Sequence, residues 1–170
     1  MRSLLRVLAF LGLAMSLACT RRAQEPAIAT DFDGASASIT LRSGWSGFEK
    51  APDGVSFCWA EGQAALLGVG RLERRARVVS FRAWSFDYPE APQQLTTVFV
   101  NGTRIGEVMI AAEPSEYSID TPWSVWDSEE NTIRLRFSRA DAPRERIQGA
   151  EDSRRLAVAF DWLRVGPKRR

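Results

Sequence analysis

Tryptophans beside charged residues in turn-like segments are the side chains of this sequence best suited to hold a ligand. The segment GWSGFE places Trp45 near Glu49, the segment PWSVWD contains Trp123 and Trp126, and Arg154 lies in the charged segment DSRR. Sugars present apolar C–H faces that stack on aromatic rings, and nearby charged groups can hydrogen-bond their hydroxyl groups. We therefore select these five residues as candidates for a carbohydrate site.

Each candidate also has a structural interpretation. In a small β-domain most tryptophans pack in the core or at its edges, and we expect this above all of Trp84 and Trp162, which lie within long apolar runs. Trp59, at the end of another apolar run, also stands out. For Glu49 and Arg154 we favour a buried ion pair that ties the first turn to the last strand, with a ligand-facing polar pair as the alternative.

The 170-residue chain contains no histidine, which limits the enzyme classes open to it. Ser-His-Asp and Cys-His catalysis, histidine general bases and histidine-ligated metals are all excluded. Glycoside hydrolysis by two carboxylates needs no histidine, but the acidic residues show no spacing that selects a pair. We therefore expect a non-enzymatic protein, with a histidine-free glycoside hydrolase as the remaining enzymatic alternative.

Calcium is the metal that this composition suits, because it takes carboxylate and carbonyl oxygens. Asp33 in the segment DFDG and Asp161 in the last apolar run are the candidate ligands. They come together if the first and last strands are neighbours. We thus predict a structural calcium site, although the chain has no EF-hand loop.

The first 19 residues resemble the export signal of a bacterial lipoprotein. Two arginines precede an apolar run that ends in small residues, as in a secretory signal peptide over residues 1–18. The uninterrupted run is shorter than the roughly 20 residues that span a bilayer. Ser16-Leu17-Ala18-Cys19 is similar to the lipobox, whose cysteine becomes the lipid-modified first residue. The sequence predicts a membrane anchor at Cys19 in the bacterial envelope, at the outer membrane or periplasmic face; ordinary secretion is the alternative.

The second cysteine, Cys58, is predicted to be buried. Once Cys19 carries lipid, Cys58 has no partner for an intramolecular disulfide. Its place in the apolar run VSFCW favours a small hydrophobic role over a nucleophilic one.

The charge balance excludes nucleic acid as a partner. Removing residues 1–18 takes away two of the 23 Lys and Arg residues and none of the 21 Asp and Glu residues, so 21 of each remain. The positive clusters that stay are RLERR at 71–75 and the basic tail at 167–170. A nucleic-acid-binding domain usually has a large one-signed face.

The chain after the signal divides into a tether and one domain. Residues 19–35 are polar and without hydrophobic periodicity, so we expect a lipidated cysteine followed by a flexible tether. Residues 36–166 contain short apolar runs separated by Gly, Pro and Asn, which predict strands and no convincing helix. The expected strands span 36–42, 55–59, 64–69, 77–86, 94–101, 104–110, 116–120, 131–138 and 155–165.

Two of these runs show clear alternation. In the first, Ile133, Leu135 and Phe137 should face inward; in the last, Leu156, Val158, Phe160 and Trp162 should do so. Asn101-Gly102 between two apolar runs predicts a hairpin. About nine short strands make an all-β sandwich, most simply a jelly roll.

Several short motifs, taken in order, resemble the galactose-binding-like jelly-roll modules of bacteria, which are similar to carbohydrate-binding modules. They are Gly44-Trp45 with Glu49, Trp59, VFVNG at 98–102, NTIRL at 131–135, and DSR at 152–154 with LAVAF at 156–160. The likeness is strongest to modules appended to membrane glycosyltransferases and sulfatase-like proteins, and covers about residues 36–166.

This resemblance implies binding of a surface polysaccharide, often with a structural calcium ion. Many such modules only pack against another domain. The alternative function is therefore a protein-docking subunit of envelope polysaccharide or glycosyltransferase machinery.

Overall fold

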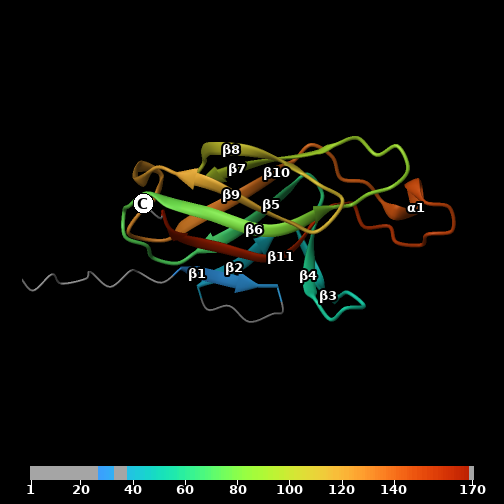
Figure 1. Cartoon of the computed structure of the whole chain (residues 1–170), viewed down its shortest axis with the longest axis horizontal. Coiled ribbons are helices and arrows are strands. Elements are labelled where there is room, and N and C mark those ends of the chain that lie inside the picture. Colours follow the sequence, from blue (N-terminus) through green and yellow to red (C-terminus); the bar gives the residue numbers. More distant parts are fainter. Residues whose placement is uncertain (1–26, 33–37, 169–170) are drawn as a thin grey trace, which may run out of the picture.

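The computed structural model describes residues 27–32 and 38–168 as a sandwich of two antiparallel sheets (Figure 1). Sheet A has the strand order β3-β4-β11-β6-β9, with β1 also paired to β11, and sheet B has the order β2-β5-β10-β7-β8. The strands are β1 (Ile28–Asp31), β2 (Ile39–Ser43), β3 (Trp45–Lys50), β4 (Ser56–Glu61), β5 (Ala64–Val69), β6 (Arg77–Ser85), β7 (Gln94–Val100), β8 (Thr103–Ile110), β9 (Ser115–Thr121), β10 (Asn131–Phe137) and β11 (Leu156–Pro167).

Helical structure in the described residues is limited to two short turns. They are a 3-10 turn η1 (Trp123–Val125) and a four-residue helix α1 (Pro143–Arg146), which lies at the opposite end of the sandwich from the C-terminus (Figure 1). Within the described part of the chain, no helix has the length and apolar character needed to cross a membrane. The all-β jelly-roll fold expected from the sequence is therefore confirmed, whereas the signal peptide and Cys19 lie outside the described residues.

The last residues of the expected tether belong to the sandwich. Residues 28–31 form β1, which pairs with the far end of β11, and the next residue, Phe32, is fully buried. The tether prediction is thus wrong for this stretch. A four-residue strand shows too little alternation to be recognised, and its partner lies more than 130 positions away in the sequence.

The inward pattern of β10 is confirmed, but that of β11 breaks midway. Leu156, Val158 and Phe160 are buried as expected. The pairing of β11 with β6 then shifts between Phe160 and Trp162, so Leu163 rather than Trp162 takes the next inward position. One extra residue in a strand turns every later side chain to the other face.

The same geometry corrects the expectation that Trp84 and Trp162 lie in the core. Trp84 alternates with the buried Phe81 and Ala83 of β6, so its ring lies on the outer face of sheet A, where it is half-buried. Trp162 pairs with Arg82, another outward residue of β6, and is also half-buried. Two large aromatic side chains therefore lie on a face that contributes nothing to the interior of the sandwich.

Cys58 is a core residue, as the sequence suggested. It is fully buried and, despite a hydrogen-bonding contact with Ser46, burial raises the pKa of its thiol. In a Cys19→Ser variant, where it is the only thiol, Cys58 should react with a thiol reagent far more slowly in the folded protein than in urea. Equal rates in the two conditions would show that the core opens readily.

Candidate functional site

Five aromatic rings form a continuous row on the outer side of sheet A, which we name the aromatic face. Ring centroids are 5.2 Å apart for Phe57 and Trp84, 6.1 Å for Phe57 and Trp59, 6.2 Å for Trp59 and Phe86, and 5.7 Å for Phe86 and Tyr88. All except Phe86 remain half-buried. The row is thus open to a ligand along much of its length.

Small residues of β11 make room for these rings. Ala159 is the register partner of Trp59 on one side and of Trp84 on the other. Ala159 is nevertheless fully buried, because the aromatic rings of its two register partners lie on the same side of the sheet. The alternation of alanine with large inward residues in β11 thereby lets rings from β4 and β6 meet across it.

An ion pair predicted from the sequence borders this row. Arg154 donates to Glu49 at 2.6 Å and to Asp152 at 2.6 Å. Glu49 is the register partner of Phe57, which places the pair beside the aromatic face. Hydrogen bonds from Arg154 lower the pKa of Asp152. The ion pair of Glu49 and Arg154 is therefore present, but it is partly exposed and not buried as expected. A ligand on the aromatic face could reach it.

A second ion pair lies on the same side of the sheet. Arg82 of β6 donates to Asp161 of β11 at 2.5 Å. Next to it, the guanidinium of Arg164 lies 4.3 Å from the ring of Trp162. The outer side of sheet A thus alternates aromatic rings with paired charges.

The expected calcium ligands are not brought together in the described residues. Asp33 lies outside them, and the carboxylate of Asp161 is bound by Arg82. In residues 27–32 and 38–168 no group of three or more His, Cys, Asp or Glu side chains is arranged to hold a metal ion. The calcium site remains a prediction.

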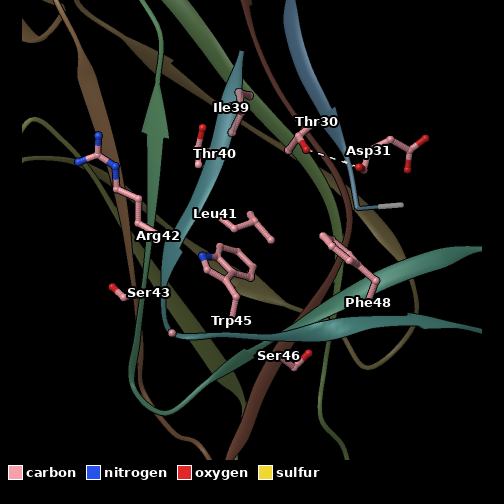
Figure 2. Close-up of a pocket in the computed structure, with 11 residues that line it drawn as sticks. Thr30, Asp31, Ile39, Thr40, Leu41, Arg42, Ser43, Trp45, Ser46 and Phe48 are labelled. Carbon is pink, nitrogen blue, oxygen red and sulfur yellow. Dashed lines mark hydrogen bonds between the residues drawn. The ribbon is translucent and has the colours of Figure 1, made fainter. Parts of the chain in front are cut away.

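Trp45 lies away from the aromatic face, in a pocket of about 400 Å³ between β1, β2 and β3 (Figure 2). Its indole Nε1 donates to the Leu66 carbonyl at 2.9 Å. Its ring packs against Phe160 at 5.5 Å, and Figure 2 shows Leu41 next to it. These contacts anchor Trp45 to the core.

The loop tryptophans Trp123 and Trp126 lie at another place again. Trp126 is 2% exposed and donates to Thr121 Oγ1 at 2.7 Å, so it is a core residue. Trp123 is 58% exposed, with Arg74 over its ring. Trp126 is far from Trp84 along β6, because its partner Thr121 pairs with the first residue of that strand and Trp84 lies near the last. The five residues selected from the sequence therefore do not form one site.

None of the five aromatic-face residues is among the ligand contacts predicted from the sequence, although Trp59 stands out there. A usable signal was present, since Phe57 and Trp59 alternate with Cys58 and Ala60, which the apolar run assigns to the core. The residue of β11 opposite Trp59 is the small Ala159. Together these two patterns indicate that the rings lie on the solvent side.

No protein-family model and no curated protein sequence matches the chain. Solved structures do match over most of it. The K1 cleaved adhesin domain of Lys-gingipain from Porphyromonas gingivalis W83 is 11% identical, with a TM-score of 0.56 over 85% of this chain and 100% of that one. The CBM22-1 xylan-binding domain of Paenibacillus barcinonensis Xyn10C is 10% identical, with a TM-score of 0.52 over 81% and 91%.

A family 35 carbohydrate-binding module from Clostridium thermocellum is 12% identical, with a TM-score of 0.50 over 81% of this chain and 97% of that one. At these identities the likeness concerns the fold. The chain is a jelly-roll β-sandwich of the kind that carbohydrate-binding modules share.

Proposed function

We propose that this protein is a non-enzymatic carbohydrate-binding domain whose ligand stacks on the aromatic face. The observation that carries the proposal is the position of Trp59 and Trp84. Both are half-buried on the outer side of sheet A, with the Arg154–Glu49 ion pair beside the row that they form. Core packing does not require aromatic rings on that side.

The chemistry of the face fits sugar binding better than sugar cleavage. Pyranose C–H groups can pack on the indole rings, while the guanidinium of Arg154 and the carboxylates around it can bind hydroxyl groups. A glycosidase general acid needs a raised pKa. Here the pKa of Asp152 is lowered by Arg154, and Glu49 and Asp161 are held in ion pairs. These carboxylates are suited to accept hydrogen bonds.

Replacing Trp59 or Trp84 with alanine tests the proposal. The domain, residues 20–170, is first applied to an array of bacterial envelope polysaccharides, and the affinity for a captured glycan is then measured by calorimetry. Each substitution should weaken binding at least about tenfold, since a lost stacking contact and its buried area are worth about 1.4 kcal/mol or more. Running the array with calcium and then with a chelator tests the calcium site.

Trp123→Ala is the matched control, because Trp123 is an exposed tryptophan outside the aromatic face. Its substitution should leave the affinity unchanged. Loss of binding in Trp123→Ala with full binding in Trp59→Ala and Trp84→Ala would move the site to the η1 loop. A blank array from well-folded protein would instead favour the second candidate, a face that docks onto an envelope protein, because its rings form an apolar surface.

We further propose that the domain is exported and held at the bacterial envelope through lipid on Cys19. The support is the lipobox-like segment that ends at this residue. Cys19→Ser should release the protein from the membrane fraction and abolish labelling by a radioactive fatty acid, without changing glycan affinity. Membrane retention of the unlabelled variant would contradict lipid anchoring.

A further inference from the structure

A second pocket opens at the end of the sandwich near α1, next to the Phe86–Tyr88 end of the aromatic face. It has a volume of about 340 Å³, within the usual range for small-ligand sites, and lies where β6 ends, β7 begins and β8 ends. Ser85, Gln94, Ile110 and Arg139 are among its lining residues.

The wall of this pocket is held in place by Arg139. Its Nε donates to the Pro92 carbonyl at 2.8 Å, and its Nη2 donates to the Phe86 carbonyl at 2.6 Å. These bonds join the segment before β7 to the segment after β6. The pocket is therefore built from tied backbone segments and is not a gap between loose loops.

Gln94 is the unusual residue of the lining. It is 1% exposed, and neither its Oε1 nor its Nε2 has a hydrogen-bond partner among the residues that the structure describes. It occupies an inward position of β7, and the inward positions after it are the polar Thr96 and the apolar Val98 and Val100. The Oγ1 of Thr96 also has no hydrogen-bond partner among the described residues. A buried amide without partners destabilises the fold, so an apolar side chain would serve packing better.

We infer that this pocket binds an acetamido group and that Gln94 recognises it. A primary amide donates through Nε2 and accepts through Oε1, which matches the C=O and N–H of an acetamido group in a paired arrangement. The apolar part of the lining, including Ile110 and Pro92, can contact the acetyl methyl group. In this conformation the amide atoms are covered, so the Gln94 side chain turns toward the opening when the group enters.

The choice of an N-acetylated sugar as the carrier of this group rests on the proposed carbohydrate-binding function. A neutral ligand is favoured over an anion. The cation in the pocket lining is Arg139, and its guanidinium is already hydrogen-bonded to the Pro92 and Phe86 carbonyl oxygens and to Asp141. The pocket therefore adds an acetamido-selective site next to the Phe86–Tyr88 end of the aromatic face.

The test is an NMR titration of ¹⁵N-labelled protein with N-acetylglucosamine, using glucose as the sugar without the acetamido group. The side-chain NH₂ signals of Gln94 are assigned by their disappearance in Gln94→Leu. N-acetylglucosamine should shift these signals to saturation and glucose should not. Gln94→Leu should weaken N-acetylglucosamine binding by about tenfold or more. Gln148→Leu, an exposed glutamine outside the pocket lining, should leave the affinity unchanged.

Four outcomes overturn the inference. The Gln94 signals do not respond to N-acetylglucosamine, they respond equally to glucose, or N-acetylalanine methylamide binds more tightly, which would indicate a peptide site. A Gln94→Leu protein that is more stable and binds the sugar normally also refutes it. The indole N–H signals of Trp59 and Trp84 report on the aromatic face in the same spectra, so failure of the proposed function is seen separately.

Discussion

Replacing Gly44 with alanine should destabilise the fold by at least about 3 kcal/mol, because two separate costs fall on this residue. Its φ of +77° is a left-handed conformation that L side chains adopt only at a cost. A Cβ atom built there would also lie 2.1 Å from the carbonyl oxygen of Ala64. Since Ala64 is backbone-paired with Arg136 of β10 at the start of β5, that oxygen can move away only by disturbing the strand. Urea unfolding followed by tryptophan fluorescence measures the loss.

Alanine substitutions at two other glycines test the conformational cost and the steric cost separately. Gly54 has a φ of +89° but open space around it, so Gly54→Ala should cost only about 1 kcal/mol. Gly47 has neither strain nor contact, and Gly47→Ala should be neutral or slightly stabilising. If Gly44→Ala lowers the free energy of unfolding by no more than Gly54→Ala does, the close approach between a Cβ atom at position 44 and the Ala64 oxygen is wrong. The position matters for function, because Gly44 is where the chain passes from β2 in sheet B to β3 in sheet A, just before Trp45 and Glu49.

Replacing Asp141 with alanine should cost about 3 kcal/mol, since it breaks a buried charge network. Asp141 is 5% exposed and accepts hydrogen bonds from Arg146 at 2.6 Å, from Tyr88 at 3.1 Å and from Arg139 at 3.4 Å. This network ties the α1 segment to the end of the aromatic face. Asp120→Ala is the control: it removes an exposed ion pair with Lys168 and should cost less than about 1 kcal/mol. Equal losses would contradict the buried network.

The same residue should contribute to acid sensitivity. Burial of Asp141 opposes its ionisation, but hydrogen bonds from Arg146 and Tyr88 outweigh burial and lower its pKa. A carboxyl group whose pKa is lower in the folded state stabilises the protein above its unfolded pKa of about 4, and this stabilisation disappears as the pH falls further. Below about pH 4 the wild type should therefore lose stability more steeply than Asp141→Asn in urea unfolding at several pH values. Parallel curves would remove Asp141 from the acid response.

Patterns among neighbouring residues were enough to predict the class of fold and several local features. Alternation in β10, the Asn101-Gly102 turn and the absence of helix periodicity depend on neighbouring residues, and each is found in the structure. The Asn101-Gly102 prediction succeeds because both residues adopt positive φ, as a two-residue hairpin requires. The burial of Cys58 follows from the same local pattern.

Which tryptophans face solvent could not be predicted, because it depends on the packing of distant strands. Trp126 and Trp45, chosen as ligand contacts, are held by the core through Thr121 and Leu66. Trp84, expected in the core, lies on the outer side of sheet A beside Phe57. A tryptophan has the same local signature in either place, since its neighbours in the sequence do not reveal which strand will pair with it.

The physical reason is that the two faces of a strand are distinguished by pairing and not by composition. A register shift after Phe160 turns Trp162 outward, and alanines in β11 let Trp59 and Trp84 lie over it from two flanking strands. These partners are between about 70 and 100 residues apart in the chain, and no periodicity within a single strand records their register. The sequence therefore determined that aromatic residues are abundant in the strands, and the pairing of β4, β11 and β6 decided that they form a surface.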